Sequence, residues 1–372
     1  MRIAVIRQEC SFSKGGAERF AANLCGALAA AGHEVTVVAE TFGPGIDPAV
    51  AHVPVKVDRT SSARRTRSFH ERSQKALAGL GVDAVLALSR TFPADAFRVS
   101  DPLHRYWMEI RYPGPVRRFL ERLNPRHRAI LALEDGIFDP ANTRMLITNS
   151  RLSKTLIGEL YDYPESSIHV VYNGVDLETF SPGATVRENG PLRLLFVGQD
   201  FRRKGLAPLL EALAIAAASG HEPVLRVIGR DDPARYRALA GDLGISARVT
   251  FEGATGKIQE AYRNADLLVF PTLYDPFANV CLEALACGLP VLTTSTNGSS
   301  EIISGDVEGY VVDGAEAGLA ARLAEQIGRF CDLPEEARDA MRVAARRKAE
   351  NFTIKSNAET VVRLLSTGRG EG

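Results

Sequence analysis

The chain has 372 residues, enough for two domains that each bury a core, and its 45% hydrophobic content is ordinary for a globular protein. Its 45 Lys and Arg residues equal its 45 Asp and Glu residues, which argues against a nucleic-acid-binding protein. The five cysteines include no C-x-x-C pair, and no apolar run is typical of a signal peptide or of a membrane-spanning helix of roughly 20 residues. The composition therefore predicts a reduced, cytosolic protein.

The first half of the chain alternates short β-branched runs with amphipathic stretches. Strands are predicted at 2–6, 34–40, 83–88 and 145–150, and a helix is predicted over 15–33. This alternation indicates a parallel sheet whose strands are joined by crossover helices. We therefore predict an N-terminal Rossmann-like domain over residues 1–171.

A second series of strands and helices begins after residues 172–191, whose Gly, Pro and Asn content is typical of an interdomain linker. It predicts a second Rossmann-like domain over 192–352. Residues 353–372 predict a separate C-terminal helix and tail, for which packing back on the N-terminal domain is one arrangement. The expected fold is therefore α/β, with two Rossmann-like domains facing each other across a cleft and ligands bound at the carboxyl ends of the strands.

The stretch "YDPFANVCLEALACGLPV" (274–291) places Asp275 on a loop after a predicted strand and Glu283 inside the helix that follows. The start of this helix, at Phe277, Ala278 and Asn279, offers backbone N–H groups and the positive end of the helix dipole to an anion such as a diphosphate. A carboxylate on either side suits sugar hydroxyls, which is the layout of a nucleotide-sugar. The alternative is that Asp275 is an ordinary loop or N-cap acid and that Glu283 is a solvated helix residue. The apolar neighbours of Glu283 favour a ligand-binding role instead.

Two further loops follow predicted strands. "FVGQDFRRKG" (196–205) carries Arg203 and Lys204, cations suited to a leaving diphosphate, although a basic loop pair by itself is usually only surface. "KGGAERF" carries Gly15 and Gly16, which let backbone approach a ligand closely or simply form a turn. This stretch matches neither G-x-G-x-x-G nor the P-loop pattern, which argues against a standard dinucleotide site.

Together with "YNGVDLETFSP", these stretches resemble the retaining GT-B glycosyltransferases of family 4 over nearly the whole chain. Within that family, "VGQDFRRKG" and "SDPLHRYW" are most similar to the lipopolysaccharide core heptose glucosyltransferases. The resemblance implies that Glu283 holds the donor ribose, that Arg203 and Lys204 face its diphosphate, and that Gly15 and Gly16 contact the phosphates.

The resemblance also implies that Asp275 touches the transferred sugar, at a position where the family usually has Glu. It implies no metal and no other cofactor, and the sequence contains no convincing D-x-D motif or His/Cys ligand cluster. On the acceptor side it implies a catalytic role for Asp101, with His104 as a substitute. A turn acid before Pro102 explains Asp101 equally well.

The segment from Arg98 to Leu131 interleaves arginines with aromatic residues. Such a composition predicts binding to an anionic membrane, and the alternative is a solvated Arg-rich helix face. The predicted membrane-binding residues are Arg105, Trp107, Arg111, Arg117, Arg118 and Arg122.

The sequence thus predicts a retaining glycosyltransferase that moves a hexose, glucose from UDP-glucose, onto a heptose of the lipopolysaccharide core. Its expected partners are a nucleotide-sugar, that core or another glycan acceptor, and an anionic membrane surface, but no nucleic acid. We expect a cytoplasmic protein that is peripheral on the inner face of the plasma membrane. The alternatives are a family 4 transferase for another lipid-linked or soluble acceptor, and a non-catalytic nucleotide-sugar-binding or membrane-scaffold protein.

Overall fold

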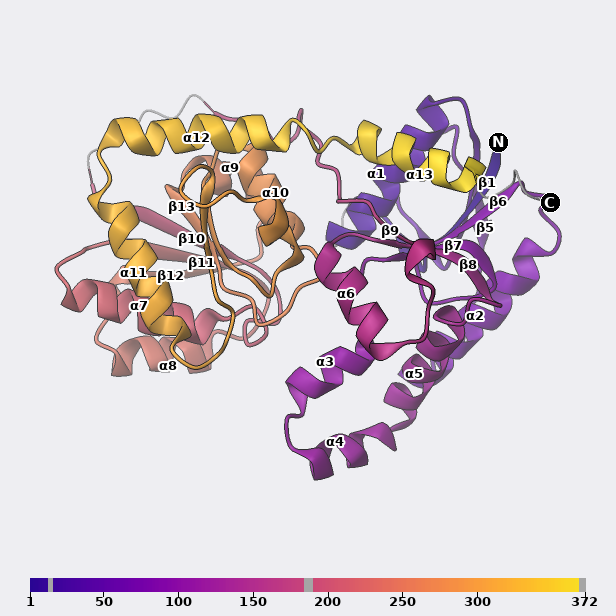
Figure 1. The fold of residues 1–372 in the computed structure, drawn as a ribbon, viewed down its shortest axis with the longest axis horizontal. Coiled ribbons are helices and arrows are strands. Elements are labelled where there is room, and N and C mark those ends of the chain that lie inside the picture. Colours follow the sequence, from indigo (N-terminus) through magenta and orange to yellow (C-terminus); the bar gives the residue numbers. More distant parts are fainter. Residues whose placement is uncertain (13–15, 184–189, 368–372) are drawn as a thin grey trace. The chain divides into compact units, whose positions relative to one another are not determined.

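The structure is a computed structural model that describes residues 1–12, 16–183 and 190–367 (Figure 1). It divides into two compact units. The first comprises Met1–Gly174 and the C-terminal part of the chain from Ile354, and the second comprises Val175–Thr353. The chain therefore leaves the first unit once and returns to it at its C-terminal end.

The first unit is built on a seven-stranded parallel sheet with the order β5-β3-β1-β6-β7-β8-β9. The strands are β1 (Arg2–Ile6), β3 (Glu34–Ala39), β5 (Ala51–Pro54), β6 (Ala84–Ala87), β7 (Ala94–Val99), β8 (Thr143–Thr148) and β9 (Ile168–Val170), and a separate pair is formed by β2 (Glu9–Cys10) and β4 (Thr41–Phe42). The helices are α1 (Gly16–Ala30), α2 (Ser62–Leu77), α3 (His104–Arg111), α4 (Pro115–Arg122), α5 (Pro125–Ile137), α6 (Arg151–Leu160) and α13 (Ile354–Thr367).

Alternation along β1 determines which helices cover which face of this sheet. Ile3 and Val5 belong to a buried cluster with residues of α1 and α13, whereas Ile6 packs with Phe69 of α2. Successive side chains of a strand point to opposite faces, so β1 packs against helices on both faces of the sheet. The last helix of the chain is thus part of the core of the first unit, where its Val361 is fully buried.

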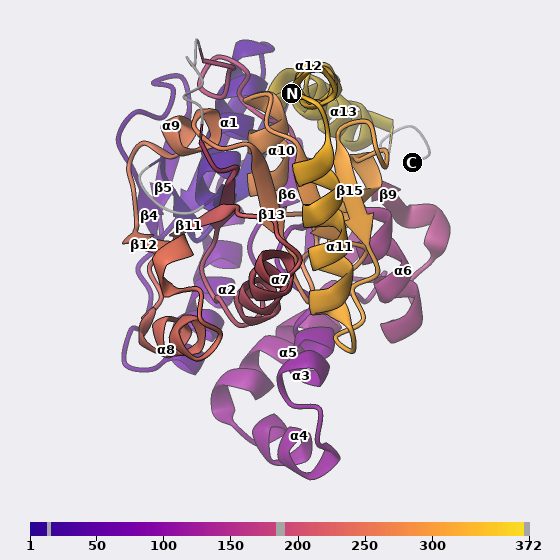
Figure 2. The same cartoon turned by 90° about the vertical axis from the view of Figure 1, so that its left-hand side faces the viewer.

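The second unit contains a six-stranded parallel sheet with the order β12-β11-β10-β13-β14-β15. Its strands are β10 (Arg193–Val197), β11 (Val224–Ile228), β12 (Val249–Gly253), β13 (Leu267–Phe270), β14 (Val291–Thr294) and β15 (Gly309–Val312), and its helices are α7 (Leu206–Ala218), α8 (Ala234–Asp242), α9 (Ile258–Arg263), α10 (Asn279–Ala286), α11 (Leu319–Asp332) and α12 (Glu335–Ala349). Helices α7 and α11 lie side by side on one face (Figure 2), and α10 packs against α12.

Both sheets have the strand order of a Rossmann fold, with the first strand of each unit beside the strand at which the order reverses direction. In the second unit these strands are β10 and β13. Connections after them turn to opposite sides of the sheet, which leaves room for a ligand at their carboxyl ends. The expected α/β fold of two Rossmann-like domains is therefore confirmed.

Among the residues that the structure describes, no helix is both long enough and apolar enough to cross a membrane.

Candidate active site

The loop between β10 and α7 presents Arg203 and Lys204 at the carboxyl end of the sheet. It closes at Gly205, whose φ of +78° lies in the left-handed region. A Cβ added to Gly205 would lie 2.0 Å from the carbonyl oxygen of Pro271, so only glycine lets this loop approach the one after β13. Backbone bonds join the two loops further, because Leu273 N–H donates to Arg203 O at 2.8 Å.

Lys204 and Asp275 form a buried ion pair between these two loops. Nζ of Lys204 donates directly to Oδ2 of Asp275, and the side chains of both residues are only 11% exposed. Arg203 extends the cluster, because its Nη1 lies 3.8 Å from the same carboxylate oxygen and donates to the carbonyl of Tyr274 at 2.9 Å. The structure thus brings together three of the predicted catalytic residues, Arg203, Lys204 and Asp275.

Burial makes the charge on Lys204 costly. Desolvation lowers the pKa of Lys204 from its ordinary value, the nearby charge of Arg203 lowers it further, and Asp275 opposes both effects. The ring of Phe270 lies 4.9 Å from Nζ and adds a cation–π contact. A buried ammonium in this position favours anions, since a negative group that enters the site would compensate the lost hydration.

The N-terminus of α10 adjoins this cluster, and side chains fix the residues that lead into it. Phe277 N–H donates to Oδ1 of Asp275 at 3.1 Å, and Ala278 N–H donates to Oδ1 of Asn297 at 3.2 Å. The helix itself begins at Asn279. The side chains of Asp275 and Asn297 thus fix Phe277 and Ala278, the two residues that lead directly into the helix.

Asn297 was not singled out from the sequence, although it organises this helix start. It is fully buried, and its amide nitrogen donates to the hydroxyl of Thr293 at 2.9 Å. The Asn-Gly pair at 297–298 was the available signal, since such pairs are typical of turns. It could not show that Asn297 accepts from the backbone of Ala278, nineteen positions earlier in the chain.

Glu283 lies about one turn along α10 from its start and is half-buried. The hydroxyl of Tyr262 donates to its Oε2 at 2.8 Å. Burial raises the pKa of Tyr262 well above its ordinary value, and the neighbouring Glu283 raises it further, so this phenol remains a donor. The carboxylate is therefore oriented by a buried partner, which the sequence analysis missed.

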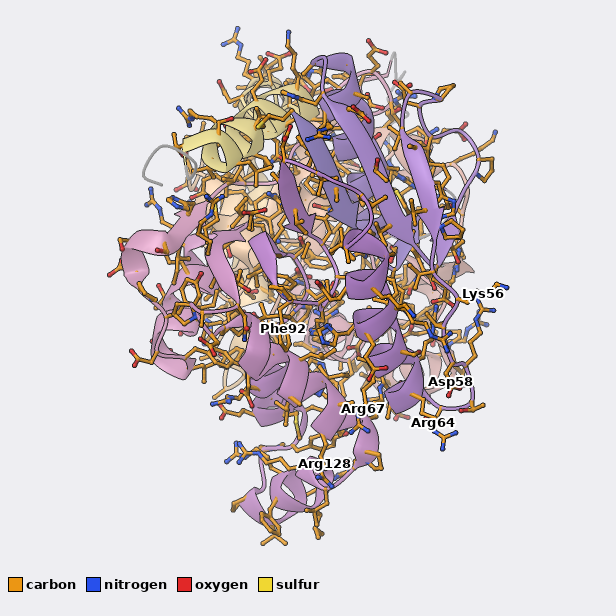
Figure 3. All side chains as sticks on the ribbon, turned by 90° about the vertical axis from the view of Figure 1, so that its right-hand side faces the viewer. Lys56, Asp58, Arg64, Arg67, Phe92 and Arg128 are labelled. Carbon is orange, nitrogen blue, oxygen red and sulfur yellow. The ribbon has the colours of Figure 1, made fainter. Side chains whose placement is uncertain are left out.

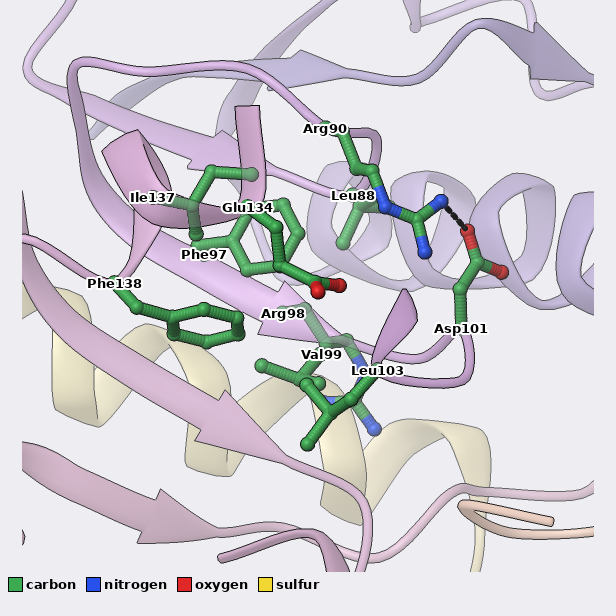
Figure 4. A pocket seen from close by; sticks show the side chains of 10 residues that line it. All are labelled: Leu88, Arg90, Phe97, Arg98, Val99, Asp101, Leu103, Glu134, Ile137 and Phe138. Atoms are coloured by element: carbon green, nitrogen blue, oxygen red, sulfur yellow. Dashed lines mark ion pairs between the residues drawn. The ribbon is translucent and has the colours of Figure 1, made fainter. Parts of the chain in front are cut away.

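Asp101 lies in the first unit, just after β7. Its Oδ2 is 3.5 Å from Nη1 of Arg90, and its side chain is 44% exposed. Figure 4 shows this ion pair at one side of a pocket that Glu134 and Phe138 also line. Asp101 is thus an accessible carboxylate with a cationic neighbour, and its role toward an acceptor stays a prediction.

His104, the other acceptor-side candidate, is buried at the start of α3. Its Nε2 lies 2.9 Å from Nδ1 of His127, and Glu134 accepts from its backbone N–H at 2.6 Å. Desolvation lowers the pKa of His104 from 6.5 to about 3, and the charges of Arg90, His127 and Arg126 contribute in the same direction. A neutral, enclosed imidazole at neutral pH fits a packing role better than the acceptor-side role.

Of the two predicted phosphate-contacting glycines, Gly15 lies outside the described residues. Gly16 is the first residue of α1 and is exposed. Its position after β1 agrees with the expected strand–loop–helix arrangement, and its contact with phosphate stays a prediction.

The structure places the predicted membrane-binding residues in different surroundings. The guanidinium of Arg105 stacks 4.6 Å from the ring of Tyr161 and pairs with Asp135 at 2.5 Å. Trp107 stacks on His104 with ring centroids 5.3 Å apart. These contacts hold both side chains against other residues of the first unit, and their part in membrane binding stays a prediction. Arg111, Arg117 and Arg122 are exposed, and Arg118 is half-buried.

Helix α4 carries an exposed apolar face that the sequence analysis overlooked. No residue of α4 is buried, and Val116, Phe119, Leu120 and the adjoining Leu123 are 73%, 63%, 59% and 56% exposed. At about 3.6 residues per turn these four side chains share one face of the helix. Figures 1 and 2 place α4 at the outer end of the extension formed by α3, α4 and α5.

Basic side chains surround this end of the first unit. At about 3.6 residues per turn, Arg117 and Arg122 border the apolar face of α4. In Figure 3, the exposed residues Arg64 and Arg67 of α2 and Arg128 of α5 lie toward the same end of the unit. An apolar helix face bordered by cations is typical of helices that lie in a membrane interface.

Comparison with known proteins places this site in a family. The model described as "Glycosyltransferase Family 4" matches residues 14–179, and the model described as "Glycosyl transferases group 1" matches residues 179–348. The lipopolysaccharide glucosyltransferase WaaG of Escherichia coli (strain K12) is 27% identical over 308 residues, which cover 79% of this chain and 80% of that protein. A D-inositol 3-phosphate glycosyltransferase of Mycobacterium sp. (strain KMS) is 33% identical over 202 residues, which cover 50% of this chain and 44% of that one.

Solved structures agree on the fold. The crystal structure of WaaG, a glycosyltransferase involved in lipopolysaccharide biosynthesis, superposes with a TM-score of 0.82 at 24% identity and covers 98% of this chain and 99% of that one. Anabaena HepE in complex with UDP-glucose superposes with a TM-score of 0.72 at 17% identity and covers 99% and 100% of the two chains. With the two family models matching end to end over residues 14–348, the chain belongs to family 4 of the GT-B glycosyltransferases.

Proposed function

We propose that this protein transfers glucose from UDP-glucose, with retention of anomeric configuration, onto a heptose of the lipopolysaccharide core at the cytoplasmic face of the inner membrane. The observation that carries the donor part is the buried cluster of Lys204, Arg203 and Asp275 beside the N-terminus of α10. The lipopolysaccharide glucosyltransferase of Escherichia coli, matched over four fifths of its length, supports the acceptor part.

In this proposal the diphosphate of the donor binds between the loops after β10 and β13. The negative charge on the leaving diphosphate grows as the sugar departs, so Arg203 and Lys204 stabilise the transition state more than the bound substrate. Lys204 is already desolvated in the free protein and therefore needs little reorganisation when the diphosphate arrives.

Glu283 would accept from the ribose hydroxyls while Tyr262 holds its other side in place. Asp275 would contact the transferred sugar from the loop, with the remainder of its carboxylate fixed by Lys204 and Phe277 N–H. A shorter Asp at this position leaves more space than the usual Glu, which is why the choice among hexoses has to be measured. Asp101 would act on the acceptor hydroxyl from the first unit.

The proposal requires no metal ion. Two cations of the chain itself, Arg203 and Lys204, supply the positive charge that a divalent ion would otherwise bring to the diphosphate. We therefore propose that turnover is unchanged when a chelator is added to the assay and is not raised by added Mg²⁺ or Mn²⁺.

The acceptor in this proposal is anchored in a membrane, and α4 supplies a means of reaching it. The apolar face of Val116, Phe119 and Leu120 would enter the headgroup region while Arg117 and Arg122 contact lipid phosphates. Each basic side chain near an anionic surface contributes about 1 kcal/mol, so a few are enough for reversible binding.

Purified protein, UDP-glucose and a heptose-terminated core oligosaccharide test the function directly. We expect a glucosylated product whose new linkage has the anomeric configuration of the donor, as read by NMR, and at least a hundredfold lower turnover in Arg203→Ala. Transfer with inversion would refute the retaining mechanism. Release of UDP without any glycosylated product would refute the proposed acceptor.

A second candidate is a family 4 transferase for a soluble phosphorylated acceptor. The D-inositol 3-phosphate glycosyltransferase, 33% identical over half of this chain, favours it. Offering inositol phosphate beside the core oligosaccharide separates the two, because only one should be consumed. A non-catalytic binding protein would bind UDP-glucose and leave both acceptors and the donor intact.

A further inference from the structure

The second unit has a pocket of about 410 Å³ behind the candidate active site, where α10 ends and α12 passes. Its wall includes Cys287 and Gly288, which directly follow α10, and four arginines from α9 and α12. The volume lies within the range of about 300–1,000 Å³ that small-molecule pockets occupy. None of the residues assigned to the donor or the acceptor lines this pocket.

Positive charge dominates the pocket. Its arginines are Arg263, Arg342, Arg346 and Arg347. Asp266 pairs with Arg342 at 2.7 Å, Asp339 lies 4.0 Å from the same arginine, and Glu350, which also lines the pocket, pairs with Arg346 at 2.9 Å. These three carboxylates offset three of the four arginine charges, and the pocket keeps an excess of positive charge. Within the part of the chain that the structure describes, the exposed guanidinium of Arg347 forms no hydrogen bond or ion pair.

Backbone carbonyl groups hold two of these arginines in place. Nε of Arg263 donates to the carbonyl oxygen of Ser181 at 2.7 Å, and Nη1 of Arg346 donates to those of Phe180 and Ala286 at 3.0 and 2.8 Å. Guanidinium groups fixed in this way lose little conformational freedom when they bind an anion. The positive charge is therefore arranged before any ligand arrives.

Part of the wall is apolar and close to the surface. Pro182 and Val343 face the same space, and Val343 is 52% exposed. A ligand that combines a small apolar part with one doubly charged oxyanion would match both the apolar wall and the arginines. Planar guanidinium groups bind phosphate oxygens in pairs. We propose that this pocket binds a small phosphomonoester, separate from the diphosphate of the sugar donor.

The pocket is joined to the donor site through α10 and α9. Arg346 donates to the carbonyl of Ala286, the last residue of α10, while Glu283 lies in the preceding turn. Arg263 follows Tyr262, whose hydroxyl orients the carboxylate of Glu283. A phosphomonoester that pulls on Arg346 or Arg263 would therefore shift Glu283, so occupancy of the pocket should change the affinity for UDP. This coupled effect rests on the proposed donor-binding function.

Calorimetric titration with glycerol 3-phosphate, in the presence and absence of saturating UDP, tests the site. We expect binding in both conditions and at least tenfold weaker binding in Arg347→Ala, whose side chain is exposed. Val343→Trp, which fills the pocket without removing charge, should also abolish binding. The matched control is Arg235→Ala, an exposed arginine of α8 outside the pocket, which should bind like the wild type.

Several results would overturn the proposal. These are no binding by the wild type, equal binding by Arg347→Ala and Val343→Trp, or loss of binding when UDP is present, because the phosphate would then occupy the donor site. A parallel titration with a short-chain phosphatidate shows whether a metabolite or a lipid headgroup supplies the phosphate.

The coupled effect is measured separately, by titrating UDP with and without glycerol 3-phosphate. Coupling is reciprocal, so the factor by which UDP changes the affinity for the probe must equal the factor by which the probe changes the affinity for UDP. Identical UDP affinities would overturn the coupling. A protein that binds the probe but never UDP would refute the donor function and leave the pocket standing.

Discussion

At the scale of single residues, the site depends on carboxylates that the protein itself holds in place. Asp275 is held by Lys204 and by Phe277 N–H, and Glu283 is held by Tyr262. The residue types and their loops could be predicted from the sequence, since each follows a recognisable strand. The contacts between these residues could not be predicted, because Lys204 and Asp275 are separated by 71 positions and nothing in either stretch specifies the other.

The role of Glu283 can be tested with ligands that lack ribose hydroxyls. If its carboxylate accepts from them, Glu283→Ala should bind UDP at least tenfold more weakly than the wild type. The variant should also no longer distinguish UDP from 2′,3′-dideoxy-UDP, because both changes remove the same interaction. Isothermal titration of both ligands into both proteins measures this, and additive losses would place the ribose elsewhere.

The buried pair has a consequence for stability. Asp275→Ala leaves the ammonium of Lys204 without its carboxylate and should lower the free energy of unfolding by about 3–5 kcal/mol. The double variant Lys204→Met/Asp275→Leu removes both charges and should lose much less. Urea denaturation compares the three proteins. If Asp275→Ala unfolded at the same urea concentration as the wild type, the pair would contribute nothing to the fold.

The lowered pKa of His104 predicts that the free energy of unfolding depends on pH. Its folded pKa of about 3 lies below the ordinary 6.5, so the unfolded chain binds the extra proton between these values. With respect to this group, the free energy of unfolding is therefore highest above pH 6.5. It falls by about 2 kcal/mol between pH 7 and pH 5. His104→Phe, which keeps the stacking on Trp107, should show a smaller decrease in unfolding free energy over this range. Equal decreases in both proteins would assign the effect to other groups.

At the scale of secondary-structure elements, the strand–helix alternation was predictable where the runs are apolar, as in β1, β3 and β10. Several strands escaped notice, two of them for clear physical reasons. β5 is an exposed edge strand that ends in Pro54, and β7 contains Arg98, a fully buried cation that donates to the carbonyl of Val171 at 3.0 Å and to Asn173. Local composition cannot show that a strand tolerates a buried guanidinium.

The Arg-rich segment was read as one stretch, but it forms three helices. Breaks occur near Pro113–Gly114 and at Asn124, where Pro115 and Pro125 begin the next helices. Only the middle helix, α4, has no buried residue, whereas Arg105 and Trp107 of α3 contact other residues of the first unit. The number of arginines attracted attention, whereas the apolar face beside them is the more informative feature.

Vesicle binding should reflect both features of α4. Phe119→Ser/Leu120→Ser should weaken cosedimentation with phosphatidylglycerol vesicles at low and at high salt, because apolar insertion is not screened. Arg117→Ser/Arg118→Ser/Arg122→Ser should weaken it mainly at low salt. Ile215→Ser, which changes a 43% exposed apolar residue of α7, is the matched control. Wild-type binding by both α4 variants would leave α4 as an ordinary solvent-exposed helix.

At the scale of the whole molecule, two sheets of the same strand order explain why the site residues occur in loops after β1, β7, β10 and β13. Within each sheet the carboxyl ends of the parallel strands lie at one edge, so residues of one unit that are far apart in sequence, such as those after β10 and β13, converge there. Periodicity and strand order alone are compatible with many different activities. The acidic and basic side chains on those loops pointed to a nucleotide-sugar, and the resemblance of these stretches to family 4 narrowed the prediction to a glycosyltransferase.

The return of the chain to the first unit sets the order in which the protein can be completed during synthesis. Residues 175–353 leave the ribosome before α13 does, so the second unit has all its residues while the first still lacks a helix. Until then, the face of α1 that packs with Val361 and Leu365 has no cover. The N-terminal half of this chain therefore matures last, against the usual order for nascent proteins, and its uncovered core is where a chaperone would be needed.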